Sequence, residues 1–478
     1  MRSPSVLIAG LGLLSAPASG AAQAGTAFVG ATVVTMTGEG TLADRTVLVR
    51  GDTIMAIGPR TSLPVPAGYR RVDAVGRWLI PGLIDSHVHL AAESDLRANL
   101  RYGVTTVLQM SGRRGDSLDF LSMRDRIDRG ELAGPRLVLT GPLFDVFGLR
   151  TETTAYAIPS LEAVPAVIAA HVARGYDFFK VHNRVPLAVY RRLVGGGRPI
   201  VGHIPMGMSI DEALRGQVMI AHAELFYYNL FGFRSIVDSS CADGFWPCVA
   251  RARADPSVLD ALAARVKRAG VAVTANLSYL AAEERVYRDF EGLLADPDFA
   301  ALPPVTQQAW RRDAPASRSF LAERRQDLEN RTGFTRALVA RFAAEGVPIL
   351  AGTDAPLAGL FPGRALHLEL AELVRAGLSA EAALRTATAA PGAFLGSHVS
   401  RLPAIGRIQV GGAADLVLLD ADPLRDISAT DRIAGVMSRG IWRPAASGQA
   451  RDEGSGGAGA AKSEKIIRTG DAPAHSGR

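Results

Sequence analysis

The sequence predicts an α/β protein: a (β/α)8 barrel, or TIM barrel, with a small β-sandwich domain formed from both chain ends. Two observations support this prediction. Between residues 81 and 399, short apolar strand candidates alternate with helical stretches, which is typical of a parallel sheet with helical crossovers. Before and after this region the chain changes to short strands separated by glycine-rich turns, which indicates a composite β domain of residues 25–80 and 400–445.

Eight strand candidates lie in the α/β region, and eight strand–helix units that close on themselves form a barrel with its active site at the C-terminal strand ends. The candidates are residues 83–90, 104–110, 136–141, 177–182, 199–205, 218–226, 271–278 and 348–354. Helical stretches separate them, for example at 91–102, 118–129, 161–174 and 256–268. Two long excursions, 227–255 and 281–332, follow the sixth and seventh strands, and we expect them to cover the active-site end as lids.

Both terminal segments differ from the predicted domains. Residues 1–24 are typical of a secretory signal peptide, because an apolar run after Arg2 leads to the small-x-small cleavage site Ala22-Gln23-Ala24. We therefore expect a periplasmic or secreted mature protein. Cys241 and Cys248 are the only cysteines, and in an oxidising compartment a loop-closing disulfide is favoured over a metal site. Residues 446–478 lack apolar periodicity, which predicts a disordered tail.

The composition favours a small-molecule partner. Apolar residues make up 48% of the 478 residues, enough for a sizeable core, and the net charge of +6 is mild. No basic block with interleaved aromatic residues indicates nucleic acid binding. No segment after the signal has the 18 uncharged apolar residues that indicate a membrane span. A homo-oligomer is compatible with the sequence.

Two histidines lie two residues apart in the first strand candidate, within Ile84-Asp85-Ser86-His87-Val88-His89-Leu90. In a strand this spacing points both side chains to the same face, so both imidazoles can reach one divalent metal. A pair of core histidines that hydrogen-bond to backbone carbonyls is the alternative.

The fourth strand candidate ends with Asp177-Phe178-Phe179-Lys180-Val181-His182, where a buried charged Lys is costly. Only four of the 53 Lys and Arg residues are lysines. Because the chain uses arginine almost everywhere else, a lysine at position 180 suggests a reaction that arginine cannot perform. A desolvated amine can lose its proton and react, for example with carbon dioxide, to form a carbamate whose two oxygens can bridge two metals. An interior Lys paired with a carboxylate is the alternative.

Further polar side chains follow the later strand candidates. His203 follows the fifth strand, His222 the sixth and Asp354 the eighth. Each alone could be an ordinary polar residue at a strand end. Their shared position at one end of the predicted barrel indicates a metal site.

The set resembles the binuclear pattern of the amidohydrolase superfamily. Ile80–Asp85 and Gly411–Val417 are also similar to that family's start and end of the barrel, and the resemblance covers nearly all of residues 28–442. Val201–Pro205 and Ser209–Glu224 most resemble the imidazolonepropionase-like and prolidase-like branch. The resemblance implies that His87, His89 and Asp354 hold the more buried metal, that His203 and His222 hold the other, and that a carbamate on Lys180 bridges them.

The expected reaction is hydrolysis of an amide or peptide C–N bond by a metal-bridging hydroxide. A dipeptide, an N-acyl amino acid or a cyclic amide is the expected substrate. Two divalent ions that share a water lower its pKa, and nitrogen and oxygen ligands without thiolate suit Zn²⁺. Asp354 is the predicted catalytic residue, because it can take up the proton of the water and pass it to the leaving amine.

Two other reactions stay open. The same site could hydrolyse a lactone or an ester. A mononuclear deaminase of the superfamily usually has a Glu three residues after the histidine of the fifth strand, where this sequence has Met206. Lys180 also argues against this reading.

Two residues are weaker candidates for substrate contact. His182 should point the same way as Lys180, although packing at the rim is an alternative. Tyr228, like its neighbour Tyr227, could donate a hydrogen bond to the substrate carbonyl, although packing within an aromatic lid is an alternative.

Overall fold

The computed structural model of the chain describes residues 25–111, 118–145, 158, 160–231 and 255–445. The signal peptide, Cys241, Cys248 and the C-terminal tail fall outside these residues, so the statements about them stay predictions. Among the described residues, no helix is both long and apolar enough to cross a membrane.

Eight parallel strands form the centre of the α/β region, in two hydrogen-bonded sheets. The first sheet has the order β6-β7-β8 and the second has the order β13-β12-β11-β10-β9. Nearly every residue in these strands is buried, as expected for parallel strands covered by helices. The strands are β6 (Leu83–Val88), β7 (Val104–Gln109), β8 (Arg136–Leu139), β9 (Phe179–Val181), β10 (Ile200–Gly202), β11 (Gln217–Ile220), β12 (Ala272–Thr274) and β13 (Ile349–Leu350).

Two isolated parallel bridges join the outer strands of these sheets. Val88 of β6 pairs with Ala355, which follows β13, and Phe144, which follows β8, pairs with Val181 of β9. Backbone hydrogen bonds support both joins, such as Asp354 N to His87 O at 2.8 Å. The eight strands therefore follow the circular order of a TIM-barrel-like fold, although regular pairing is confined to the two sheets.

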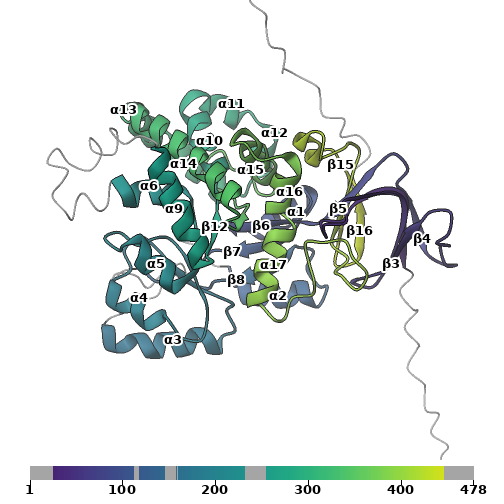
Figure 1. Cartoon of the computed structure of the whole chain (residues 1–478), viewed down its shortest axis with the longest axis horizontal. Coiled ribbons are helices and arrows are strands. Elements are labelled where there is room, and N and C mark those ends of the chain that lie inside the picture. The colour runs from purple at the N-terminus through teal and green to yellow at the C-terminus, as the bar shows by residue number, and fades with distance from the viewer. Residues whose placement is uncertain (1–24, 112–117, 146–157, 159, 232–254, 446–478) are drawn as a thin grey trace, which may run out of the picture. The chain divides into compact units, whose positions relative to one another are not determined.

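Helices follow the strands in sequence and surround them (Figure 1). Local signals set their ends: in α9, the Asp255 side chain caps the N-terminus, Pro256 is the first residue, and Gly270 ends the helix in a left-handed conformation. The helices are α1 (Glu93–Arg101), α2 (Phe120–Asp128), η1 (Leu161–Ala163), α3 (Val164–Ala173), α4 (Leu187–Leu193), α5 (Ile210–Gly216), α6 (Glu224–Phe231), α9 (Pro256–Ala269), α15 (Arg364–Arg375), α16 (Ala380–Thr386), α17 (Ala389–His398) and η2 (Ile427–Asp431).

Two predicted strands extended into helices. Residues 218–226 and 271–278 were expected to be strands, but β11 ends at Ile220 and β12 at Thr274, and helices α6 and α10 follow after short connections. The apolar residues continue into the buried first turns of these helices. A short apolar run cannot distinguish a buried strand from a buried helix, which explains the error.

The excursion at residues 281–332 is helical. Five helices span it and its flanks: α10 (Leu277–Arg288), α11 (Phe290–Leu294), α12 (Pro297–Ala301), α13 (Pro304–Glu323) and α14 (Arg325–Glu345). They are attached to the barrel through α10, which contacts α15, and α14, which contacts α6 and α9. Most of the other predicted lid, 227–255, lies outside the described residues.

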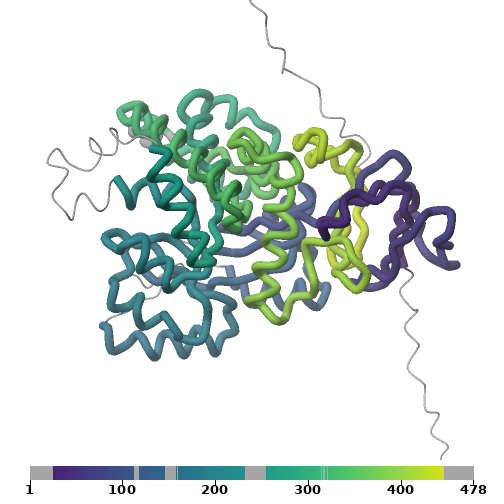
Figure 2. The backbone as a smooth tube through the Cα atoms, in the orientation of Figure 1, coloured from purple at the N-terminus to yellow at the C-terminus, as the bar shows by residue number. Residues whose placement is uncertain are grey.

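Both chain ends build one sheet, as the composite β domain requires. Its path is β16-β15-β14-β5-β1-β2-β3, with β4 paired to β1. Figure 2 shows the purple N-terminal and yellow C-terminal segments coming together in it. The pairings describe one continuous sheet, so the predicted sandwich of two sheets is not established. The strands are β1 (Thr26–Val34), β2 (Thr41–Arg50), β3 (Thr53–Pro59), β4 (Arg70–Asp73), β5 (Trp78–Pro81), β14 (Leu416–Leu419), β15 (Ile433–Ser438) and β16 (Ile441–Pro444).

A buried ion-pair cluster joins this sheet to the N-terminal end of a barrel strand. Arg136, the first residue of β8, donates from Nε to Asp415 at 2.7 Å and from Nη2 to Asp52 at 2.6 Å. Burial lowers the pKa of the guanidinium, but the two carboxylates outweigh burial, so the pKa is raised. Each buried charge is therefore matched by its partners.

Candidate metal centre

The predicted metal ligands lie at, or just beyond, the C-terminal ends of five barrel strands. His87 is in β6, with His89 just beyond it, and Lys180 is in β9. The other three follow β10, β11 and β13: His203, His222 and Asp354. Because parallel strands in a barrel end on the same side, these side chains face a common space.

Three ligand-type atoms form a close triangle. The Nε2 atoms of His87 and His89 are 3.3 Å apart. Asp354 Oδ1 is 3.5 Å from His87 Nε2 and 3.3 Å from His89 Nε2. His222 Nε2 lies 3.7 Å from the other oxygen, Asp354 Oδ2. One ligand atom from each of His87, His222 and Asp354 lies within 4.8 Å of the others, so this group could hold a metal ion.

The His222 ring lies close to those of both His87 and His203. Its ring centroid is 4.5 Å from that of His87 and 4.9 Å from that of His203. His203 Nδ1 is 2.6 Å from Asn183 Oδ1, and an amide oxygen only accepts hydrogen bonds, so Nδ1 carries the proton. The Nε2 atom of His203 thus keeps the lone pair that a metal ligand needs.

Lys180 is buried beside these histidines without a hydrogen-bond partner. Its side chain is among the largest fully buried ones, and Nζ makes no hydrogen bond. Burial lowers the pKa of the amine to about 7, against the attraction of Asp354. A large fraction of Lys180 is therefore neutral near pH 7, and the alternative of an interior Lys that hydrogen-bonds to a carboxylate does not describe this residue.

Three of the histidines are held in the neutral form. Burial lowers the pKa of His87, His203 and His222 well below the usual value, and neighbouring cationic groups, including Lys180, lower it further. Neutral imidazoles have the free lone pair that metal binding requires. The Nδ1 atoms of His87 and His222 are also buried without hydrogen bonds.

Two of the predicted ligands adopt a strained backbone conformation. His222 has φ 66° and Asp354 has φ 63°, in the left-handed region that non-glycine residues rarely occupy. Such residues cost on the order of 1–3 kcal/mol each and cluster at functional sites. At both positions the strain lies at a strand end, where the chain turns.

Asp85 holds the backbone around the site in place through hydrogen bonds. Its Oδ1 accepts hydrogen bonds from the backbone N–H groups of His87 and Thr353, both at 3.1 Å, and its Oδ2 accepts from Thr353 Oγ1 at 2.7 Å. These bonds tie β6 to the segment after β13. Gly352 allows the close approach, because a Cβ there would lie 2.9 Å from the His87 Cβ. Burial raises the pKa of Asp85 to about 7.

The two predicted substrate contacts, His182 and Tyr228, have different neighbours. The His182 ring is 4.3 Å from that of His203, and its Nδ1 is 3.6 Å from Asp145 Oδ2. Tyr228, in α6, accepts a hydrogen bond from Arg331 at 2.7 Å. His182 is part-exposed, as a substrate contact requires, and Tyr228 is half-buried.

Sequence reasoning missed three residues that contact this group: Asn183, Glu224 and Arg331. Glu224 Oε1 is 3.5 Å from His222 Nδ1. The pattern His222-x-Glu224 could have suggested this contact, whereas no local signal links Arg331 to Tyr228, 103 residues earlier.

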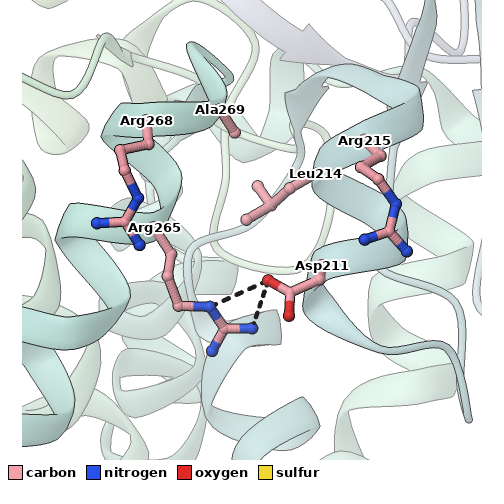
Figure 3. Close-up of a pocket in the computed structure, with 6 residues that line it drawn as sticks. All are labelled: Asp211, Leu214, Arg215, Arg265, Arg268 and Ala269. Carbon is pink, nitrogen blue, oxygen red and sulfur yellow. Dashed lines mark hydrogen bonds and ion pairs between the residues drawn. The ribbon is translucent and has the colours of Figure 1, made fainter.

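A separate surface hollow of about 380 Å³ lies between α5 and α9. Figure 3 shows Asp211 facing Arg265 across it, and Arg265 Nη2 is 2.7 Å from Asp211 Oδ1. This carboxylate already pairs with the nearest guanidinium. The hollow is lined by helix residues and by none of the strand-end residues, so it is distinct from the candidate metal centre.

Comparison with known proteins finds similarity to amidohydrolases. The sequence pattern of the amidohydrolase family matches residues 221–443. A 5-methylthioadenosine/S-adenosylhomocysteine deaminase of Symbiobacterium thermophilum is 43% identical over 63 residues, 13% of this chain and 14% of that protein. The structure of a bottromycin amidohydrolase is similar with a TM-score of 0.65 at 24% identity, covering 88% of this chain and 87% of the other. That of a Xaa-Pro dipeptidase gives 0.61 at 17%, covering 88% and 100%.

The match over residues 221–443 agrees with the resemblance to amidohydrolases that the motifs predicted. Both names of the predicted branch, prolidase and imidazolonepropionase, occur among the similar proteins. The structural similarity extends over most of the chain and supports the TIM-barrel-like fold. The chain spans only 16% of the length of the mycobacterial relatives and 14% of the deaminase.

Proposed function

We propose that this chain hydrolyses an amide or peptide C–N bond with two divalent cations, most simply Zn²⁺, held by His87, His89, Lys180, His203, His222 and Asp354. The main observation is the convergence of neutral imidazoles, one carboxylate and one buried amine without a hydrogen bond at a single end of the barrel. No packing requirement explains so many polar groups there.

The residues present fit a metal. Zn²⁺ bound tetrahedrally at about 2.0–2.1 Å places its ligand atoms roughly 3.3 Å apart. The three separations among His87 Nε2, His89 Nε2 and Asp354 Oδ1 are 3.3–3.5 Å. The close approach of two imidazole nitrogens to a carboxylate oxygen also suits a shared cation.

Lys180 fits the role of a carbamate-bearing bridge. Its amine has no hydrogen bond to break and is neutral in part near pH 7, which reaction with carbon dioxide requires. The new N–C bond forms at Nζ as the amine loses a proton, and two oxygens are then available as ligands. Burial among apolar strand residues protects the product from water.

When bound, the cations lower the pKa of a water and polarise the substrate carbonyl. Residues of the chain transfer the protons and hold the ligands in position. Asp354, with its carboxylate between His89 and His222, takes up the proton of the attacking water and transfers it to the leaving nitrogen. Asp85 holds the backbone of His87 next to the segment that carries Asp354. Asn183 accepts a hydrogen bond from His203 Nδ1, which keeps the proton on that nitrogen.

Dipeptides, N-acyl amino acids and cyclic amides are the proposed substrates, with Tyr228 as a hydrogen-bond donor to the carbonyl oxygen and His182 as a contact at the rim. The dipeptidase and amidohydrolase neighbours support this class. Lactone or ester hydrolysis at the same site is the second candidate. Deamination is less favoured, because Met206, which is 46% exposed, supplies no carboxylate.

A hydrolysis screen tests the proposal. Protein loaded with Zn²⁺ is incubated with alanyl-proline, N-acetylmethionine, a cyclic dipeptide, a lactone and adenosine, and products are quantified. Amine release that is lost on chelation and restored by metal is the expected result. Ammonia from adenosine without any amide hydrolysis would favour the deaminase, and lactone turnover alone would favour the second candidate.

A further inference from the structure

Thr274 is a fully buried polar residue to which the proposed reaction gives no role. It is the last residue of β12, and its side chain is 0% exposed. Taking a hydroxyl out of water costs free energy unless the hydroxyl is hydrogen-bonded. The hydrogen bonds of Thr274 therefore indicate why this position carries a threonine.

Two oxygens of Thr274 bind two successive backbone N–H groups. The His222 N–H donates to Thr274 Oγ1 at 3.1 Å, and the Ala223 N–H donates to the Thr274 carbonyl oxygen at 3.0 Å. The Thr274 hydroxyl itself donates to Asn276 Oδ1 at 2.6 Å, since an amide oxygen only accepts. The hydroxyl proton thus points to Asn276, and the lone pairs of Oγ1 are left for the His222 N–H.

The residue that Thr274 binds has an unusual backbone conformation. His222 has φ 66°, in the left-handed region. A non-glycine residue persists in this conformation only where surrounding contacts enforce it. Before His222, the Ala221 N–H donates to Gly202 O at 2.7 Å, so the end of β10 fixes the chain on that side. Thr274 then fixes the chain at His222 and at the next residue.

The left-handed turn directs the His222 side chain to the other candidate ligands. Its Nε2 is 3.7 Å from Asp354 Oδ2, and its ring centroid is 4.5 Å from that of His87. Strand β11 ends at Ile220, so regular strand pairing does not set the direction of this side chain. The direction follows from the turn that Thr274 binds.

We propose that Thr274 is a positioning residue that holds His222 in its left-handed conformation and thereby directs the imidazole to the metal centre. This rests on the proposed function, because His222 is a ligand only if the site holds a metal. Thr274 acts through the backbone of His222 and not as a ligand. A ligand that is fixed before the metal binds loses less freedom on binding, so the contact should contribute to metal affinity.

Thr274→Val tests the hydroxyl, because valine has nearly the shape of threonine and cannot accept the His222 N–H. Affinity for Zn²⁺ is measured by competition with a chelator of known affinity. Loss of a supporting contact at a metal site lowers affinity by about 10- to 100-fold, and we expect a loss in this range. Thr274→Ser keeps the hydroxyl and should stay close to wild type. Wild-type affinity in Thr274→Val would overturn the proposal.

Thr388→Val is the matched control. Thr388 is also 0% exposed, and its hydroxyl donates to Leu384 O at 2.7 Å instead of to a residue near the metal centre. Both valine variants lose a buried hydrogen bond, so both should unfold at a lower urea concentration than wild type. Only Thr274→Val should lose Zn²⁺ affinity, and equal losses in the two variants would contradict the positioning role. If Thr274→Val does not fold, Thr274→Ala provides the same comparison.

A second measurement needs neither metal nor substrate. Metal-free protein is labelled with ¹³C and ¹⁵N at histidine, and the His222 signal is the one of nine that is absent in His222→Asn. Its ¹³Cα shift depends on φ, so it should move in Thr274→Val and stay in place in Thr274→Ser and Thr388→Val. An unmoved signal in Thr274→Val would show that the hydroxyl does not set this conformation. If wild type bound no Zn²⁺ but the signal moved, the proposed function would fail, and the hold of Thr274 on His222 would stand.

Discussion

Two buried basic side chains at opposite ends of the barrel strands differ in whether they have hydrogen-bond partners. Arg136, at the N-terminal end of β8, is bound by Asp415 and Asp52 in short hydrogen bonds. Lys180, in β9 beside the candidate ligands, has no hydrogen bond at all. Partners raise the pKa of the first, and burial lowers the pKa of the second to about 7.

The difference shows that a buried charged group can serve either the fold or the chemistry of a site. A buried ion pair can hold two parts of a chain in register, and its groups stay charged and inert. A buried amine without a partner is destabilising as a cation, so it persists only where another group compensates or where its reactivity is used. Four predictions follow this contrast, from the largest expected effect to the smallest.

Lys180→Arg or Lys180→Ala should remove the proposed carbamate that bridges the two metal ions. Supporting residues at metal sites change affinity or activity by about 10- to 100-fold, and loss of a direct ligand should exceed this. Lys267→Arg, at an exposed lysine paired with Glu345, is the control. Metal analysis should find about two ions per wild-type chain and fewer in both Lys180 variants. Added formate should partly restore activity to Lys180→Ala but not to Lys180→Arg, where the guanidinium fills the space.

Asp354→Asn should separate chemistry from metal binding. The amide keeps the size of the side chain and one oxygen, but it cannot take up a proton, so kcat should fall by about 10²- to 10⁴-fold. Metal content should fall much less than kcat. Asp211→Asn, in the distant surface hollow, provides the comparison and should match wild type in both measurements. Parallel loss of metal and rate in Asp354→Asn would make Asp354 a ligand only.

Arg136→Met should destabilise the fold without altering the site. The change leaves Asp415 buried and unpaired, and breaking a buried pair in this way costs about 3–5 kcal/mol. Arg60→Met removes an exposed pair with Asp44 and should cost about 0–1 kcal/mol. Urea unfolding measures both. A kcat of folded Arg136→Met far below that of wild type would show that this anchor also serves catalysis.

His171→Gln should weaken the acid sensitivity of the fold. Burial lowers the pKa of His171 to about 4, and its Nε2 donates to Phe178 O at 3.0 Å. An unfolded His titrates near 6.5, so stability is full above that pH and falls as pH drops from 6.5 to 4, by up to about 3 kcal/mol. The variant should lose this slope, whereas His398→Gln on α17 should retain it. Unfolding free energies at pH 7 and pH 4.5 are the measurement.

The strand-end residues were predictable because two periodicities locate them. Alternation of apolar strands and helices gives the barrel, and polar residues at successive strand ends must then converge. His87, His203, His222 and Asp354 meet for this reason. The Lys180 environment was also foreseeable, since a lone lysine between Phe179 and Val181 is buried in any parallel strand.

The supporting contacts could not be predicted, because they join segments with no local signal. Arg331 meets Glu283 and Tyr228 from positions 48 and 103 residues away. The excursion was expected as a lid without a defined structure. It is helical, and only its packing against α6 brings Arg331 to the site. The overlong strands at 218–226 and 271–278 failed because apolar runs of this length suit either structure.

The pairing of β5 with β14 has a consequence for synthesis. Trp78–Pro81 exits the ribosome early, but its antiparallel partner Leu416–Leu419 follows more than 330 residues later. The β-sheet therefore keeps an open edge while the whole barrel emerges, and open edges invite pairing with other chains. Chains that end before Leu416 should aggregate through this edge, so the last strands act as a completion step for the newly made protein.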